Sequence, residues 1–129
     1  MKFAYTILYV RDAAQSLAFY ESAFGFPRRF LHDSGMYGEL ETGSTTLAFA
    51  AESLARSTFP NGIQTADLSG PPAASEVGFT TPDVPAAYDQ ALRAGATAVA
   101  APATKPWGQV VAYVRDPDGH LVEICTPMA

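Results

Sequence analysis

The sequence predicts an α+β fold built from two tandem copies of one strand-helix-hairpin module. Each half holds an apolar strand, a helical segment capped by aspartate and ended by glycine, and a hairpin. Setting Asp12 against Asp83 and Gly25 against Gly95 leaves offsets of 71 (83 − 12) and 70 (95 − 25) residues. Because the two offsets agree across the whole strand-helix unit, we interpret the chain as a duplicated module of about 55 residues.

The first half opens with a predicted strand at Phe3–Val10, FAYTILYV. This stretch is rich in aromatic and β-branched residues and is too short and too uniformly apolar for an amphipathic helix. In RDAAQSLAFYESAFGF, Asp12 is the expected N-cap, and Leu17, Tyr20 and Phe24 recur at helical spacing up to the glycine. The sequence therefore predicts a strand followed by a helix.

A hairpin is predicted next, from the alternation through Tyr37–Glu41, a Thr-Gly-Ser turn and the apolar run Thr46–Ala50. The first module, about residues 1–57, thus contains a strand, a helix and two or three further strands. Residues 58–74 hold two glycines and three prolines without a hydrophobic period, and we expect them to form a linker.

The second half repeats the order over about residues 75–129. It predicts a strand at Glu76–Thr80, a helix that begins after Asp83 and runs through Tyr88 and Leu92, and a hairpin within QVVAYVRDPDGHLVEIC. A length of 129 residues with 48% hydrophobic content is enough for one good core, so we expect a single domain at residues 1–129.

Composition excludes several classes of partner. The formal charge of −5 and the pI near 4.8 argue against nucleic acid and against an anionic membrane surface. No apolar run approaches the roughly 20 residues that span a bilayer, and MKFAYTILYV continues into RDAAQS without a small-residue cleavage site, so we expect a cytoplasmic protein. The single cysteine, Cys125, lies in an apolar strand and is expected to be a buried small hydrophobe.

Two stretches carry a family resemblance. LYVRDAAQSLAFYESAFGF, followed in the second half by YVRDPDGHLVEI, resembles the vicinal oxygen chelate superfamily, which groups glyoxalase I, bleomycin-resistance proteins and extradiol dioxygenases. The resemblance covers nearly the whole chain. It implies two βαβββ modules that form an open half-barrel around a central pocket, usually in a homodimer. Because this fold serves several chemistries, it does not by itself determine a function.

The resemblance also implies positions for metal ligands, namely a histidine in the first strand of each module and a glutamate in the last. These positions fall on Tyr5, Ala48, Glu76 and Glu123. Only the two glutamates can bind a metal, whereas first-row metals favour a set that includes imidazole. We therefore expect no cofactor, and keep a divalent metal held by the two glutamates as the alternative.

Glu123 interrupts the apolar strand LVEIC, and alternation places it on the pocket side with Leu121, while Val122 and Ile124 turn toward the helices. If Glu76 approaches it on a neighbouring strand, the two carboxylates repel and one pKa rises. Such a pair suits a general acid and base, and equally the capture of a cationic group. Exposure to solvent or pairing with a basic side chain remains open.

An aromatic row follows the first strand. Alternation assigns Tyr5, Ile7 and Tyr9 to the pocket face, with Phe3 continuing the row, while the residues between them face the helix. Such a floor suits a flat hydrophobic ligand through stacking, although ordinary core packing would give the same pattern. Trp107, in the loop KPWGQ, is either a stacking residue at the pocket rim or an anchor for its loop.

Other polar residues are expected to be structural. His32 lies in the polar connection LHDSG and His120 in a hairpin turn, so we expect solvated or turn-bonding roles for both. Glu39 and Glu41 alternate on one hairpin face; they either add to an acidic pocket wall or face water, and we favour water. Capping and salt bridges are the expected roles of four residues at strand ends, namely Arg11, Asp12, Arg115 and Asp116.

The favoured hypothesis is a non-catalytic protein of the glyoxalase/bleomycin-resistance type. It would sequester a flat hydrophobic ligand, cationic in the version that the acidic charge suits, without an intact metal site, as in antibiotic resistance. The alternative is a glyoxalase- or lyase-type enzyme that uses Glu123 and Glu76 as metal ligands or as acid and base. A weaker third hypothesis is an accessory domain with no ligand of its own.

Overall fold

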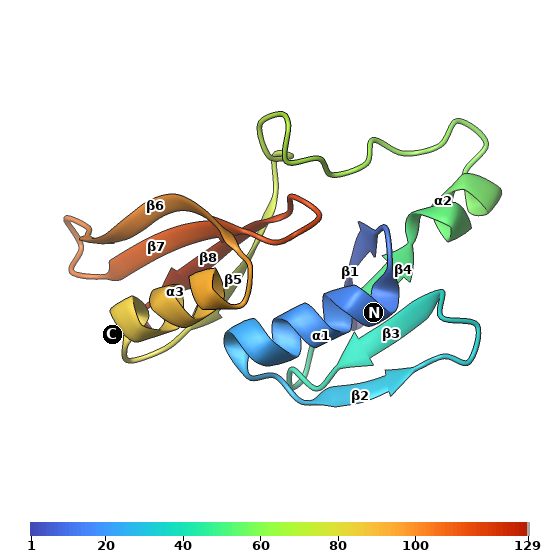
Figure 1. Ribbon diagram of the computed structural model, residues 1–129. Helices are drawn as coiled ribbons and strands as arrows, with labels where there is room; N and C mark the ends of the chain where they lie inside the picture. The colour runs from blue at the N-terminus through green and yellow to red at the C-terminus, as the bar shows by residue number, and fades with distance from the viewer. Residues whose placement is uncertain (129) are drawn as a thin grey trace. The chain divides into compact units, whose positions relative to one another are not determined.

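The computed structural model describes residues 1–128, and the chain divides into two compact units (Figure 1). The first unit ends at Ala66 and the second begins at Asp67. No helix in the described part of the chain is long and apolar enough to cross a membrane. These two units are module 1 and module 2.

Module 1 contains one four-stranded sheet and two helices. Its elements are β1 (Tyr5–Val10), α1 (Ala13–Phe24), β2 (Arg28–Leu31), β3 (Tyr37–Leu40), β4 (Thr46–Ala51) and α2 (Glu52–Thr58). The strand order is β1-β4-β3-β2, with β1 parallel to β4 and the other pairs antiparallel. The helix α1 is therefore the connection that carries the chain from one edge strand to the other.

Module 2 repeats this topology. Its elements are β5 (Glu76–Thr80), α3 (Val84–Arg93), β6 (Thr97–Thr104), β7 (Val110–Arg115) and β8 (Leu121–Cys125). The strand order β5-β8-β7-β6, with β5 parallel to β8, matches module 1 strand for strand. The predicted α+β class with two tandem βαβββ modules is thus confirmed.

The helix boundaries follow from the capping residues that the sequence predicts. The carboxylate of Asp12 accepts a hydrogen bond from the backbone N–H of Gln15 at 3.2 Å, and Asp83 does the same for Ala86 at 3.1 Å. Gly25 ends α1 in the left-handed conformation, at φ 77°, which a residue with a side chain adopts only at a cost.

The helix α1 packs on one face of the module 1 sheet. Leu17 and Tyr20 are fully buried on α1, and the ring of Tyr20 contacts that of Phe49 on β4 at a centroid distance of 4.9 Å. Gly38 of β3 lies directly under Leu17, so that an added Cβ would collide with the Leu17 side chain. This face, which also carries Leu8, therefore forms the core of module 1.

Two elements were not predicted from the residues. The helix α2 begins at Glu52 without a side-chain cap, because its N-cap is Ala51, so it lacks the usual start signal. The strand β6 consists of alanine, threonine, one valine and one proline, and most of its residues are exposed at the sheet edge. Neither segment has the periodicity that would identify it.

Candidate functional site

In each module the long helix covers one face of the sheet, and we call the opposite face the open face. In module 2 the fully buried residues Val114, Val122 and Ile124 lie on the helix side. Tyr113 and Glu123, which are paired across β7 and β8, lie on the open face and are partly exposed. The predicted alternation along β8 is therefore present.

Glu123 is held by a tyrosine that the sequence did not single out. The hydroxyl of Tyr113 donates to Glu123 Oε1 at 2.8 Å. That hydrogen bond, together with desolvation and the charges of Glu123 and Glu76, raises the pKa of Tyr113 to about 12. At neutral pH the phenol is therefore protonated, and it donates a charge-assisted hydrogen bond that fixes the carboxylate.

Glu76 lies near Glu123, although it is mostly exposed. Desolvation, and next the negative charge of Glu123, raise the pKa of Glu76 above its ordinary value. Glu76 is two residues before Gly78, the residue of β5 that pairs with Glu123. The structure thus brings the two predicted carboxylates together on one open face, and no ion pair to either is present in the described part of module 2.

The thiol of Cys125 belongs to the same open face. It is buried, and desolvation followed by the hydrogen bond to Glu123 raises its pKa to about 11. Because the thiolate is the reactive form, this environment makes the thiol inert at neutral pH.

The open face of module 1 is apolar and aromatic along β1. Tyr5 is 54% exposed and Ile7 41% exposed, while the ring of Tyr9 packs edge to face on Phe59 at a centroid distance of 6.0 Å. Ala48 pairs with Ile7 and is fully buried. The predicted aromatic row is therefore present on one face, with two of its members open to solvent.

The register shows which residues of the two modules are equivalent. Ile7 pairs with Ala48 in module 1, and Gly78 pairs with Glu123 in module 2. Since the sheets share one topology, Ala48 occupies the place of Glu123, and Tyr5 the place of Glu76.

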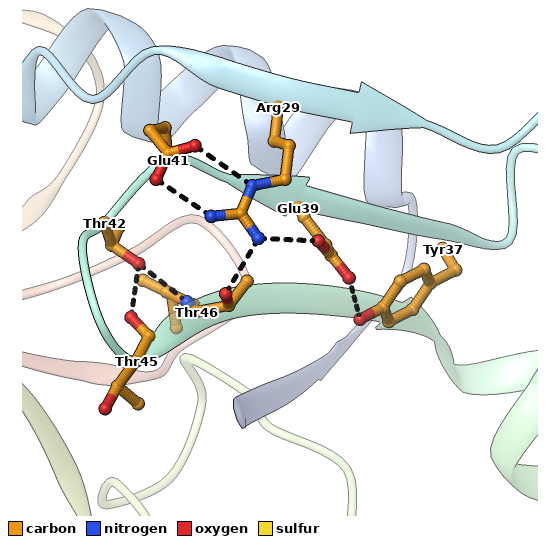
Figure 2. Close-up of polar contacts among 8 residues, drawn as sticks. Arg29, Tyr37, Glu39, Glu41, Thr42, Thr45 and Thr46 are labelled. Atoms are coloured by element: carbon orange, nitrogen blue, oxygen red, sulfur yellow. Dashed lines mark hydrogen bonds and ion pairs between the residues drawn. The ribbon is translucent and has the colours of Figure 1, made fainter. Parts of the chain in front are cut away.

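A polar network lies around Arg29 (Figure 2), and one of its members, Glu39, pairs with Ala48. The Arg29 guanidinium donates to both oxygens of Glu41 at 2.8 and 3.1 Å, to Glu39 at 3.3 Å and to the Thr46 hydroxyl at 3.0 Å. The hydroxyl of Tyr37 donates to Glu39 at 2.7 Å, and desolvation together with this hydrogen bond raises the pKa of Tyr37.

The expectation that Glu39 faces water is wrong. The residue is only 7% exposed, because it pairs with Ala48 on the open face and is closed in by Arg29 and Tyr37. Glu41 does reach solvent, and its bidentate pair with Arg29 lowers the pKa of its carboxyl. A buried carboxylate in this position has its charge compensated within module 1.

The donor set at the four implied metal positions does not fit a first-row metal. Tyr5 and Ala48 replace two ligands in module 1, and neither offers an imidazole or a carboxylate. In module 2, Glu76 and Glu123 supply oxygen ligands only, and one of these oxygens, Glu123 Oε1, already accepts a hydrogen bond from Tyr113. Among residues 1–128 no group of three or more His, Cys, Asp or Glu side chains is placed to hold a metal ion.

Trp107 lies on the turn between β6 and β7, with 63% of the residue exposed. Its indole N–H donates to the side chain of Gln109 at 2.8 Å, so the ring is tethered locally. His32 makes a turn contact, with Nδ1 at 2.8 Å from the Ser34 hydroxyl. The backbone N–H of His120 donates to Asp116 at 2.9 Å within its own turn.

The motif RDPDG forms the end of β7 and the turn before β8, and its arginine side chain contacts the linker. Arg115, only 8% exposed, donates to three backbone carbonyl oxygens, those of Gly119 at 3.0 Å, Gly70 at 2.6 Å and Asp67 at 2.8 Å. Asp116 is fully buried and accepts N–H groups of its own turn. Arg115 thus holds the linker to the β7–β8 turn through hydrogen bonds to backbone carbonyls. This role differs from the salt bridge that the sequence suggested.

Several residues of the open faces were missed in the sequence. Tyr113 and Tyr37 sit in alternating strands, and the strand pairing that brings them to a carboxylate has no signature along the chain. Arg29 reaches Glu39 across a bulge between Arg28 and Phe30, which no sequence pattern announced.

The fold and the open faces define the class as a duplicated βαβββ protein in which only module 2 retains carboxylates at the implied ligand positions. The family profile of the Glyoxalase/Bleomycin resistance protein/Dioxygenase superfamily matches residues 2–124. The chain therefore belongs to this superfamily.

Solved structures share this fold. A glyoxalase-related enzyme from Fulvimarina pelagi is 21% identical with a TM-score of 0.83, covering 98% of this chain and 88% of that one. A superfamily enzyme from Burkholderia phytofirmans PsJN is 22% identical with a TM-score of 0.82, covering 98% of both chains. A protein of unknown function from Agrobacterium tumefaciens str. C58 is 28% identical with a TM-score of 0.77, covering 98% and 94%. No curated protein matches the chain.

Proposed function

We propose that the protein is a non-catalytic small-molecule-binding member of the superfamily. The observation that carries this proposal is the loss of half of the implied metal set, since Tyr5 and Ala48 stand at the two positions of module 1. A site reduced to the two carboxylates of module 2, one of which accepts a hydrogen bond from Tyr113, is poorly suited to retain a metal ion.

Each open face, taken by itself, suits one kind of ligand. Exposed rings and aliphatic side chains at Phe3, Tyr5 and Ile7 suit a flat hydrophobic body, because such surface is costly to leave in water. Glu76 and Glu123 supply negative charge without a basic partner among the described residues of their own module, which suits a cationic group. The net charge of −5 would attract such a ligand over a longer range.

The direct test is elemental analysis of purified, tag-free protein after parallel dialysis against trace zinc, manganese, nickel and iron. We expect less than about a tenth of a metal ion per chain, since two carboxylates bind these ions weakly. Binding of flat cationic compounds, followed through Trp107 fluorescence, should then saturate at a fixed stoichiometry. One retained metal per chain together with substrate turnover would end the proposal.

A glyoxalase- or lyase-type enzyme is the second candidate, and the raised pKa of Glu76 favours it. A carboxyl whose pKa moves toward neutrality is better suited to proton transfer than an ordinary one. Under this alternative, Glu76→Gln and Glu123→Gln would abolish turnover while leaving the fold intact. If both variants keep every measurable activity and ligand affinity, this candidate fails.

A further inference from the structure

Module 2 has a strand glycine that its backbone conformation does not require. Gly78 lies in the middle of β5, at the edge of the sheet, and it is exposed. Seven of the ten glycines of the chain have a positive φ, which favours glycine, and Gly78 is not among them. A glycine inside a strand weakens it, since there is no side chain to pack. The backbone at this position could therefore carry another residue.

Packing does not require this glycine either. Gly38, the other glycine within a strand, lies under Leu17, so that an added Cβ would collide. A Cβ at Gly78 would meet nothing closer than 4.0 Å, and the atoms at that distance are Cβ and Oε2 of Glu123. Because this is ordinary van der Waals contact, alanine would fit without displacing the carboxylate. The glycine thus leaves open space beside Glu123.

The equivalent position of module 1 carries a large side chain. Ile7 pairs with Ala48 on β1 and β4, as Gly78 pairs with Glu123 on β5 and β8. Module 1 therefore has an aliphatic side chain beside a methyl group, whereas module 2 has bare backbone beside a carboxylate. Since the two sheets share one topology, the fold itself does not demand a glycine here.

The atoms around this space determine which group can occupy it. Tyr113 donates to Oε1 of Glu123 at 2.8 Å and so holds the carboxylate, while Oε2 is the oxygen nearest the space. Glu76, two residues before Gly78 on the same side of β5, adds negative charge. No ion pair to either glutamate is present within residues 67–128. A small cationic group with N–H donors therefore fits the space.

We propose that Gly78 is a specificity-determining residue, which leaves room for the protonated amine of a ligand to lie against β5 and donate to Glu123 Oε2. This inference rests on the proposed binding function and adds to it the position and the class of the cationic group, an ammonium group with N–H donors. A quaternary ammonium group is larger and has no N–H, so this space discriminates against it.

The test compares two probes of equal charge with the same flat body, 2-naphthylmethylammonium and its N,N,N-trimethyl derivative, titrated calorimetrically at neutral pH. Wild-type protein should bind the primary ammonium about tenfold more tightly, the size expected of one charge-assisted hydrogen bond. Gly78→Val fills the space and should reduce this preference to less than about twofold. The control Thr80→Val keeps the side-chain shape two residues further along β5 and should retain the preference.

A double-mutant cycle tests whether the space acts through Glu123. Glu123→Gln alone should also remove the preference, because it removes the charge that the ammonium group contacts. The double variant Gly78→Val/Glu123→Gln should then bind the primary ammonium no more weakly than the weaker of the two single variants. Additive losses would mean that Gly78 acts independently of Glu123, and would overturn the inference.

Thermal unfolding without ligand separates a binding role from a structural one. Gly78→Ala should leave the Tm unchanged or raise it, because alanine fits the space and restricts the unfolded chain more than glycine does. A clear fall in Tm would show that the fold requires the glycine, and the space would then need no ligand to explain it.

The outcomes distinguish the two proposals. If both probes bind the wild-type protein equally, or if Gly78→Val keeps the preference, the role of Gly78 is wrong while the binding function stands. If neither probe binds the wild-type protein, the binding of flat cationic ligands is wrong and the role of Gly78 falls with it.

Discussion

Each module pairs one tyrosine hydroxyl with one glutamate, but the glutamates stand on different strands. In module 2, Tyr113 on β7 donates to Glu123 on β8. In module 1, Ala48 occupies the place of Glu123, and the carboxylate comes from Glu39 on the adjacent strand β3. Glu39 is neutralised by Arg29, whereas Glu123 has no such cation within residues 67–128, the described part of its module. Because of this difference, the open face of module 2 is the more acidic of the two open faces.

The Tyr113–Glu123 hydrogen bond can be tested through the titration of the phenol. Glu123→Gln removes the charge and the acceptor that raise the pKa of Tyr113 to about 12, so this pKa should fall toward 10, the ordinary value. NMR of labelled tyrosine rings, assigned with Tyr113→Phe, measures it. Tyr37, bonded to Glu39 in the other module, is the internal control and should keep its raised pKa.

Glu76 gives a pH-dependent prediction for stability. Its folded pKa is raised above the unfolded value of 4.5, so its contribution is fully present below that value and is lost as the pH rises through the folded pKa. Glu76→Gln should therefore match the wild type near pH 4 and be more stable at neutral pH, by less than about 1 kcal/mol because the side chain is mostly exposed. Urea unfolding at both pH values decides this, and equal stability at neutral pH would contradict it.

At the scale of elements, the packing of α1 on the sheet depends on one strand glycine. Gly38→Ala on β3 would drive a methyl group into Leu17 of α1, with the carbonyl oxygen of Phe30 only 3.2 Å from the new atom. We expect a loss of about 1–3 kcal/mol in the free energy of unfolding. The matched control is Gly78→Ala on β5, where the nearest atoms lie at 4.0 Å, and it should change stability far less.

The second prediction at this scale concerns the hydrogen bonds by which Arg115 holds the linker to the β7–β8 turn. Arg115→Met leaves the carbonyls of Gly70, Asp67 and Gly119 without their charged donor, and should cost about 3 kcal/mol. Thermolysin should then cut faster beside Leu68, which is already exposed.

The control variant is Arg28→Met. It breaks a half-exposed ion pair with Glu21 and should lower the free energy of unfolding by less than about 1 kcal/mol. The milder Arg115→Lys keeps the charge but only one donor group, so it should fall between the two. If thermolysin cleaves the Arg115→Met variant no faster than the Arg28→Met variant, Arg115 does not hold the linker in place.

At the scale of the whole molecule, exposed apolar side chains on module 1 favour a dimer. Phe30, Leu54 and Phe59 are exposed in addition to the side chains that we assign to the ligand, and apolar surface of this kind is usually covered. We expect light scattering after size exclusion to give twice the chain mass of 13.7 kDa. A mass of one chain at every concentration tested would contradict this expectation.

The sequence determined the duplication, the class of fold and the ends of two helices. Those features are local, because an aspartate caps its own helix and a glycine with positive φ ends it. Alternation was likewise enough to place Glu123 and Tyr5 on the open faces, since side-chain direction follows from the strand itself.

Only the tertiary structure decided which polar groups meet. The contacts of Tyr113 with Glu123, of Arg29 with Glu39, and of Arg115 with the linker join residues 10 to 48 positions apart. Local sequence patterns determine the direction of each side chain. Strand pairing and burial determine its hydrogen-bond partners and the charge state of its ionisable group.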